Sequence, residues 1–151
     1  MTRKVAVITG AASGIGQALA VAFARQGVAV AGGFYPADPH DPDETRRLVA
    51  EAGGECLMLP LDVTFTESVD DLAAQAVKAF GRIDYAVANA GLLRRAPLLE
   101  MTDERWNEML DVDLTGVMRT FRAAVRHRRA TSPCPRCSHA IAPPRPHRAL
   151  R

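Results

Sequence analysis

Apolar positions along the first part of the chain alternate between two periods. The β-branched run from Arg3 to Thr9, which is followed by a glycine, predicts a buried strand. The segment from Gly14 to Arg25 predicts a helix that ends before Gly27, a residue suited to the left-handed conformation at a helix end. The core face of this helix is expected to carry the apolar residues at helical spacing, Ile15, Leu19, Ala22 and Phe23.

The unit of strand followed by helix recurs about every thirty residues. Strands are expected at Val28–Gly33, Glu55–Pro60 and Ile83–Ala88, and helices at Asp43–Ala52, Glu67–Phe80 and from Thr102 or Asp103 to about Arg126. The last two helices have apolar faces, formed by Val69, Leu72, Ala73, Ala76, Val77 and Phe80 in one and by Trp106, Met109, Leu110, Leu114, Val117, Met118 and Phe121 in the other. Because the strands are apolar on both faces, the pattern predicts an α/β fold with a parallel sheet and right-handed crossovers.

The composition fits one soluble domain. The chain has 151 residues, of which 48% are hydrophobic and 24% charged, and its formal net charge is +2. No stretch approaches the roughly 18 consecutive apolar residues of a membrane span. The apolar run after the basic N-terminus, Val5 to Ile8, is too short for a secretory signal, so a cytoplasmic location is expected. The odd count of cysteines, Cys56, Cys134 and Cys137, fits a reducing compartment.

The small net charge conceals two different parts of the chain. Up to Arg126 there are thirteen basic and seventeen acidic residues, whereas residues 127–151 hold six arginines and no acidic residue. This last part also contains five of the ten prolines, and its large apolar residues are almost confined to Ile141 and Leu150. Such a segment cannot form a core. We therefore expect a domain over residues 1–126 and a basic, Pro- and Arg-rich tail over residues 127–151.

Three interpretations of this tail compete. By composition it is a disordered, solvated segment. As a binding patch, the tail has the charge to bind nucleic acid but lacks aromatic residues that could stack on bases. The candidate zinc ligands are Cys134, Cys137, His139 and His147, but a zinc site is not expected because seven residues separate His139 from His147. The third interpretation, which we favour, is that the tail is not in the reading frame of the domain, because the composition changes abruptly at a helix end.

A glycine-rich loop joins the first strand to the first helix. It reads T-G-A-A-S-G-I-G from Thr9 to Gly16, where backbone N–H groups and the helix dipole can hold a pyrophosphate. Gly10 permits the tight turn, Gly14 lets the backbone approach the phosphates, and Gly16 lets helix and strand pack closely. In this position between strand and helix, the loop indicates dinucleotide binding.

Four motifs in sequence order resemble those of the short-chain dehydrogenase/reductase family. They are the T-G-x-x-x-G-x-G loop, Asp62-Val63, which looks like the adenine-contacting pair, Asn89-Ala90-Gly91, which looks like the N-A-G motif, and D-V-D-L-T-G from Asp111 to Gly116, which resembles N-V-N-L-T-G. The resemblance covers Arg3 to about Arg126. It implies an incomplete Rossmann-type, doubly wound parallel sheet of order 3-2-1-4 with helices on both faces. It also implies a cofactor site that comprises Gly10, Ser13, Gly14, Ile15, Gly16, Asp62, Val63, Asn89, Ala90 and Gly91.

Three of the matched polar residues also have structural interpretations. Asp62 can act as a loop or helix-capping carboxylate, and Asn89 as an amide that ties two strands together. Asp113 stands where the family usually has asparagine, so an ionised side chain there can only accept hydrogen bonds. The proton-relay role that the resemblance would give this position is compromised, and an aspartate on a partly exposed helix face is the alternative.

The resemblance implies a hydride exchange between a nicotinamide and an alcohol or carbonyl, with a tyrosine that transfers the proton, a lysine four residues later and a serine. The tyrosines of this chain are Tyr35 and Tyr85, and neither is followed by such a lysine. Ser132 and Ser138 do not follow a strand-like apolar run. We therefore assign no catalytic residue, and we expect the chain to keep cofactor binding and lack catalysis.

The choice between NAD and NADP stays open. The second strand ends at Gly33, Phe34 and Tyr35, without the acid that would bind the ribose of NAD or the base that would bind the 2′-phosphate of NADP. Asp38 lies about where a ribose-binding acid is sought, but prolines flank it and it can instead start a turn.

The sequence supports two functional interpretations. The first is a truncated or frame-shifted NAD(P)-dependent short-chain dehydrogenase/reductase, whose full-length form acts on an unknown small alcohol or carbonyl compound. Its open sheet edge and exposed helix face are expected to cause self-association or aggregation. The alternative is a non-catalytic nucleotide- or partner-binding module whose basic tail contacts an acidic partner.

Overall fold

The computed structural model describes residues 3–131. Its strands are β1 (Val5–Thr9), β2 (Ala29–Phe34), β3 (Cys56–Pro60) and β4 (Tyr85–Val87). Its helices are α1 (Gly14–Arg25), α2 (Pro42–Glu51), α3 (Thr66–Phe80), the 3₁₀ turn η1 (Leu98–Glu100), α4 (Asp103–Leu110), the π-helical segment η2 (Asp111–Thr115) and α5 (Gly116–Thr131). The elements alternate in the order that the apolar pattern predicts.

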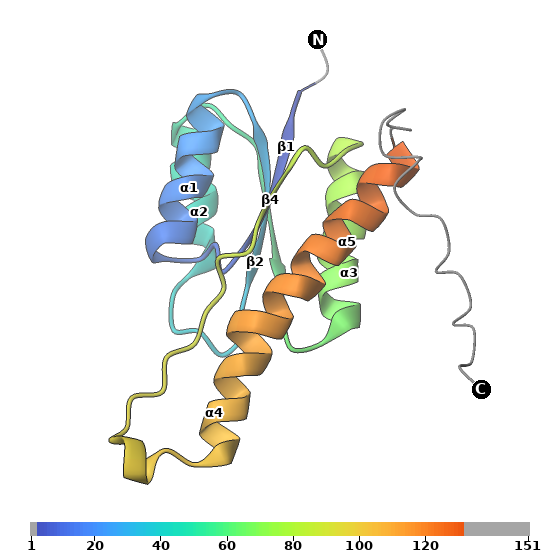
Figure 1. The fold of residues 1–151 in the computed structure, drawn as a ribbon. Coiled ribbons are helices and arrows are strands. Elements are labelled where there is room, and N and C mark those ends of the chain that lie inside the picture. The colour runs from blue at the N-terminus through green and yellow to red at the C-terminus, as the bar shows by residue number, and fades with distance from the viewer. Residues whose placement is uncertain (1–2, 132–151) are drawn as a thin grey trace, which may run out of the picture.

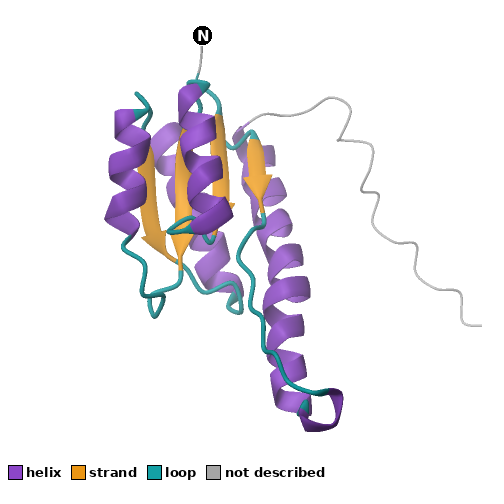
Figure 2. Cartoon of the chain, turned by 90° about the vertical axis from the view of Figure 1, so that its left-hand side faces the viewer, coloured by secondary structure: helices purple, strands orange, loops and turns teal. Residues whose placement is uncertain are grey.

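The four strands form one parallel sheet of order β3-β2-β1-β4. Helices α1 and α2 pack together on one face, and α3 and α5 pack together on the other (Figures 1 and 2). This arrangement confirms the predicted doubly wound sheet of order 3-2-1-4. The loop after β4, with η1 and α4, extends beyond the carboxyl ends of the strands (Figure 1).

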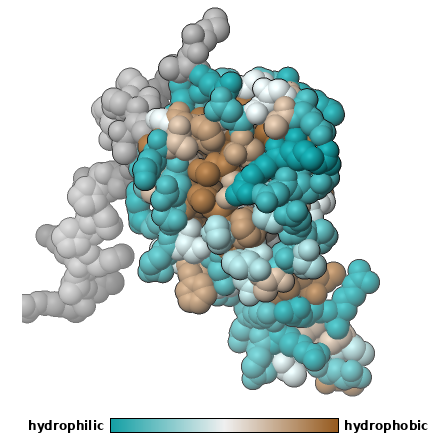
Figure 3. Space-filling model, turned by 180° about the vertical axis from the view of Figure 1, so that it is seen from behind, coloured by the Kyte–Doolittle hydropathy of each residue, from teal (hydrophilic) through white to brown (hydrophobic). Residues whose placement is uncertain are grey.

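Two apolar clusters fill the space between the sheet and its helices. Strand β1 is buried along its whole length because it lies inside the sheet, with β2 and β4 on its two sides. On one face, α3 contributes the apolar side chains that its spacing predicts, and Val69, Leu72, Ala73 and Ala76 are buried. Burial of such side chains is the main favourable contribution to folding. Strand β3 forms the opposite edge of the sheet from β4. The rear view shows an apolar area surrounded by hydrophilic residues (Figure 3).

Helix α1 turns a different face to the core from the one that its large apolar residues predict. The buried residues are Gly16, Ala20 and Ala24, whereas Ile15 is exposed and Leu19 is only half-buried. Small side chains fill this face because α1 packs closely against the sheet. The expected core face is therefore wrong for Ile15 and, on the same helix, for Ala22, which is also exposed.

The last helix also packs through its small residues. The side chain of Thr102 accepts a hydrogen bond from the N–H of Arg105, which confirms this threonine as the N-cap of α4. Along α5 the buried residues include Gly116, Thr120, Ala123 and Ala124, which face α3 and the sheet. The large apolar side chains that were expected to form a core face lie outside it: Trp106, Leu110, Leu114, Met118 and Phe121 are exposed, and Met109 and Val117 are half-buried.

The C-terminal predictions fall largely beyond the described residues. Helix α5 continues past Arg126 to Thr131, so the first residues of the predicted tail are helical. Two groups of residues named in the sequence analysis lie outside the described part of the chain. They are the serines Ser132 and Ser138 and the candidate zinc ligands Cys134, Cys137, His139 and His147. Within residues 3–131, no helix combines the length and apolar character needed to cross a membrane, and no cluster of three or more His, Cys, Asp or Glu is placed to hold a metal ion.

Candidate functional site

The glycine loop lies at the carboxyl end of β1, directly before the first turn of α1. Gly10 and Gly14 have φ values of 67° and 53°, which residues that carry a side chain rarely adopt. A Cβ atom on Gly14 would meet nothing within 4 Å, so the space in front of this backbone is open. Ser13 is the N-cap of α1, but its hydroxyl makes no capping hydrogen bond. The first turn of α1 thus presents N–H groups without helical partners to an open space.

Gly16 has the opposite surroundings. A Cβ atom there would overlap the carbonyl oxygen of Gly10 and lie 2.6 Å from Nδ2 of Asn89. The absence of a side chain therefore lets α1 start directly against the loop, as the spacing of the glycines predicts.

Polar side chains from α1 and α2 hold the glycine loop in place. The hydroxyl of the buried Thr45 donates to the carbonyl of Ala11 at 2.9 Å. The Gln17 amide donates to the Thr45 hydroxyl at 3.0 Å and to the carbonyl of Ala12 at 3.2 Å. No local sequence pattern reveals Thr45 and Gln17, because their contacts join separate helices to the loop.

Asn89 ties the end of β4 to the end of β1. Its Nδ2 donates to the carbonyl oxygens of Thr9 and Gly10, each at 3.0 Å. In return, the hydroxyl of Thr9 accepts hydrogen bonds from the N–H groups of Asn89 and Ala90, also at 3.0 Å. These bonds give Asn89 the structural role that was considered for it, and they fix Ala90 and Gly91 beside the glycine loop.

Asp62 shapes the loop between β3 and α3. Its Oδ1 accepts hydrogen bonds from the N–H and the hydroxyl of Thr64, at 2.9 and 2.7 Å. Its own N–H donates to the hydroxyl of Ser68 at 3.0 Å, and the adjacent Val63 is buried against Gly116. The carboxylate therefore acts as the loop-stabilising group that was one of its two interpretations, while the residue also borders the cleft described next.

A cleft of about 920 Å³ opens at the carboxyl ends of the strands. This is the edge of a parallel α/β sheet at which ligands bind. Nine of the ten predicted cofactor-site residues line it: Gly10, Ser13, Gly14, Ile15, Asp62, Val63, Asn89, Ala90 and Gly91. Gly16 is buried beneath the loop instead. The structure thus brings three separate sequence motifs to one cavity.

An ion pair that the sequence did not reveal closes one side of this cleft. The guanidinium of Arg94, on the loop after β4, donates to both carboxylate oxygens of Glu108 on α4, at 2.8 and 3.0 Å. The hydrogen bonds from Arg94 lower the pKa of Glu108. Both residues line the cleft, and the pair holds the loop against the helix.

Asp113 acts on the same loop from the π-helical segment η2. Its Oδ1 accepts a hydrogen bond from the N–H of Leu92 at 2.8 Å, directly after the Asn89–Gly91 motif. A carboxylate suits this position because a backbone N–H needs only an acceptor. Asp113 is thus an exposed residue that braces the wall of the cleft, and it does not line the cavity itself.

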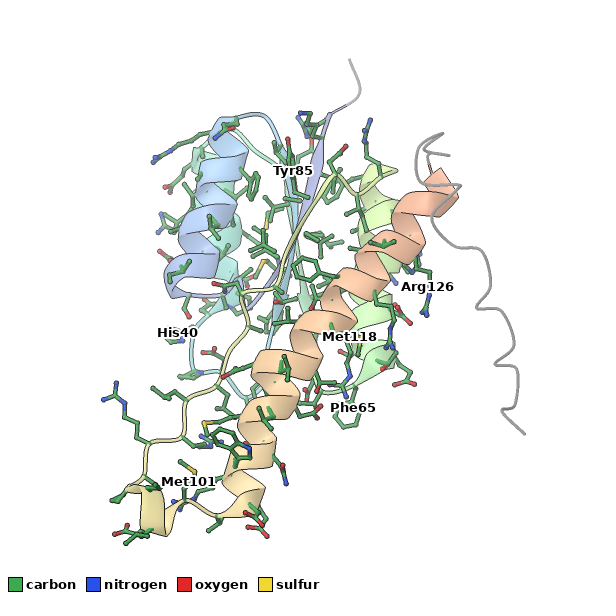
Figure 4. The ribbon with its side chains drawn as sticks, in the orientation of Figure 1. His40, Phe65, Tyr85, Met101, Met118 and Arg126 are labelled. Carbon is green, nitrogen blue, oxygen red and sulfur yellow. The ribbon has the colours of Figure 1, made fainter. Side chains whose placement is uncertain are left out.

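Tyrosine and lysine do meet in this structure, but away from the cleft. The Nζ of Lys4 donates to the Tyr85 hydroxyl at 3.0 Å, which raises the pKa of Lys4. Tyr85 opens β4 at its amino end, whereas the cleft lies at the carboxyl ends, and Figure 4 shows Tyr85 and His40 at opposite ends of the sheet. This pair therefore cannot serve chemistry in the cleft.

Comparison with known proteins links this architecture to dehydrogenases. Residues 4–132 match the family model described as short chain dehydrogenase. The chain is 41% identical over 125 residues to cis-4-hydroxycyclohexanecarboxylate dehydrogenase from Sinomonas cyclohexanicum, an alignment that covers 82% of this chain and 49% of that protein.

Solved structures give the same picture. Carveol dehydrogenase from Mycobacterium avium in complex with NAD is 33% identical with a TM-score of 0.77, over 84% of this chain and 50% of that one. An alcohol dehydrogenase from Thermococcus sibiricus complexed with 5-hydroxy-NADP is 41% identical with a TM-score of 0.76, over 85% and 55%. The chain spans about half the length of the relatives that it matches.

Proposed function

The chain belongs to the short-chain dehydrogenase family, and from this premise we propose that it is the dinucleotide-binding part of an NAD(P)-dependent oxidoreductase. The observation that carries the proposal is the glycine loop, whose Gly14 leaves open space before the first turn of α1 at the mouth of the cleft. Relatives whose structures hold NAD or an NADP derivative support it.

The residues of the cleft fit such a cofactor in three places. The pyrophosphate is suited by the N–H groups at the start of α1 and by the hydroxyl of Ser13, which makes no capping hydrogen bond. Asp62 and Val63 border the part of the cleft that suits the adenine, and the Asn89–Gly91 backbone borders the part that suits the nicotinamide. When bound, the nicotinamide supplies hydride exchange with an alcohol or carbonyl compound.

Dinucleotide binding is expected to depend on Gly14. Calorimetric titration of the chain with NAD and with NADP should show weak binding, and Gly14→Val should reduce the affinity by about tenfold or more because it removes close N–H contacts to the phosphates. Gly81→Val is the matched control: Gly81 also has a positive φ, 83°, and open space around it, but it ends α3 away from the cleft. Flat titrations of folded protein, or equal losses in both variants, contradict the proposal.

Binding without turnover is expected of the chain as given. Its 151 residues contain no tyrosine followed four positions later by lysine, and positioned proton transfer alone contributes about 10²- to 10⁴-fold to a rate. An assay of nicotinamide absorbance with alcohols and ketones should therefore detect no reaction. Turnover by the purified chain that Gly14→Val abolishes would disprove this expectation.

The family match also bears on the C-terminal tail. The match ends at residue 132, close to the point where the composition changes to arginine, proline, cysteine and histidine. This coincidence supports the proposal that the following residues are read in a different frame from the domain. Reading the coding DNA past the Arg126 codon distinguishes a frameshift from a selected basic tail. Another reading frame that encodes a strand, a serine and Y-x-x-x-K would support the frameshift.

A further inference from the structure

Three arginines join helix α5 to α3 and to the loop before α3. Arg119, Arg122 and Arg126 recur at spacings of three and four along α5, so they lie on one side of the helix. Helix α3 packs beside α5 (Figure 1). Arg122 donates to the hydroxyl of Thr66 at 3.1 Å, and Arg126 donates to the carboxylate of Asp70 at 2.7 Å. These two contacts are exposed and lie along α3, outside the cleft.

Arg119 instead binds the loop between β3 and α3. Its Nη1 donates to the backbone carbonyl of Val63 at 3.1 Å and to Oδ1 of Asp111 at 2.8 Å, and a longer hydrogen bond of 3.4 Å reaches the carbonyl of Asp111. The Arg119 side chain is 16% exposed, compared with 57% for Arg126. Because water screens a charge less where it is partly buried, Arg119 is expected to make the strongest contacts of the three arginines.

The first turn of α5 fixes Val63 from two sides. A Cβ atom on Gly116 would lie 2.9 Å from Cγ2 of Val63, so the valine side chain rests directly on the helix. Arg119, three residues after Gly116, binds the carbonyl of the same valine. Val63 lines the cleft although it is almost fully buried. Helix α5 therefore helps to set the position of this part of the cleft wall.

The π-helical segment η2 receives the other hydrogen bonds from Arg119, at Asp111, its first residue. The next residue, Val112, lines the cleft. Asp113 accepts a hydrogen bond from the N–H of Leu92 in the loop after β4. Segment η2 thus contacts both walls of the cleft, the β3–α3 loop through Arg119 and the loop after β4 through Asp113. Irregular helical turns of this kind are frequent at functional sites.

We propose that Arg119 is a positioning residue for dinucleotide binding, because its link between Val63 and Asp111 holds two walls of the cleft at a fixed separation. This inference rests on the proposed function. Arg119 itself is not among the residues that line the cleft, so it acts through the backbone of Val63 and through η2. A wall that is ordered before the ligand arrives favours binding, since ordering it then costs no binding free energy.

Arg119→Met tests this link, because methionine has no charge and no hydrogen-bond donor. The carbonyl of Val63 and the carboxylate of Asp111 then lose the partner that they share. The affinity for NAD should fall by roughly two- to tenfold, the range expected when a side chain or short segment must be ordered on binding. Arg119→Lys should recover part of this loss, because an ammonium group can still donate to both oxygen atoms.

The measurement is calorimetric titration of the full chain with NAD, with circular dichroism to show that each variant is folded. Arg126→Met is the matched control, because it makes the same change on the same helix and breaks an ion pair to Asp70 on α3, outside the cleft. It should lower the urea concentration at the midpoint of unfolding but bind NAD like the unmodified chain. A purely structural role of Arg119 would likewise lower the stability of Arg119→Met without changing the affinity of the folded protein.

The outcomes separate this inference from the proposed function. It is overturned by an unchanged affinity of folded Arg119→Met, by an equal loss in Arg126→Met, or by a loss in Arg119→Lys as large as in Arg119→Met, and each of these leaves the proposed function standing. If Arg119→Met does not fold, Arg119→Gln takes its place, because its shorter and uncharged side chain should also bind NAD more weakly than Arg119→Lys does. Failure of the unmodified chain to bind NAD overturns both.

Discussion

Gly16→Val is expected to destabilise the domain by about 3 kcal/mol or more, because the new side chain has no space to occupy. Its Cβ would overlap the carbonyl oxygen of Gly10 and lie 2.6 Å from Nδ2 of Asn89. Neither group can move freely, since the same Asn89 amide binds the Gly10 and Thr9 carbonyls. Ordinary domains are stable by only about 5–15 kcal/mol, so much of the free energy of unfolding would be lost.

Urea or thermal unfolding followed by circular dichroism measures this effect. Ala18→Val is the matched control, because Ala18 lies on the same helix and is exposed. The control should change the free energy of unfolding by less than about 1 kcal/mol, the range of helix-propensity differences between ordinary residues. If the two variants unfolded at the same denaturant concentration, the close contact between α1 and the loop would not be needed for the fold.

The glycine loop could be predicted from the sequence because each glycine there meets a local requirement. Gly10 and Gly14 have positive φ values, and Gly16 is pressed against backbone, so the spacing of the three is tied to the backbone path between strand and helix. The strand order followed from the family resemblance and agrees with the observed sheet. Local patterns that fix a backbone shape are thus readable in a single sequence.

The packing faces of α1 and α5 could not be predicted in the same way. Periodicity identifies a stripe of large apolar residues but does not identify what covers it. In α1 the core side consists of Gly16, Ala20 and Ala24, since the helix lies close to the sheet. In α5 it includes Ala123 and Ala124 against α3, while Phe121 stays outside. In both helices the close contact with neighbouring elements leaves room only for small side chains on the buried face.

Residues that meet only in the folded chain were also missed. Arg94 and Glu108 are fourteen positions apart, and their ion pair forms because the loop after β4 runs back along α4. Thr45 reaches the glycine loop from thirty-four positions away. Neither contact leaves a local pattern in the sequence. Asp38 was identified as a candidate, but its partner His40 became visible only through the geometry of the turn.

The chain is expected to self-associate through the exposed face of α4 and α5. Trp106, Leu110, Leu114, Met118, Phe121 and Val125 recur at spacings of three and four and are all exposed. Two large aromatic side chains in this stripe are about half exposed to solvent, Trp106 at 53% and Phe121 at 48%. Within the described residues, the edge strand β4 also pairs only with β1. A soluble monomer usually tolerates exposed apolar patches of only about 300–600 Å², and covering several hundred Å² would gain on the order of 10 kcal/mol.

Size-exclusion chromatography with light scattering, together with a thermal melt, tests this expectation. The unmodified chain should elute above the monomer mass or melt without a sharp transition. Phe121→Glu should shift it toward the monomer, because a carboxylate in the middle of the stripe must stay hydrated. Leu99→Glu makes the same change at a fully exposed leucine on η1, off the stripe, and should leave the mass distribution unchanged. A monodisperse monomer with a sharp cooperative transition would show that the stripe is tolerated in water, and an equal effect of both variants would show that contact does not occur through α4 and α5.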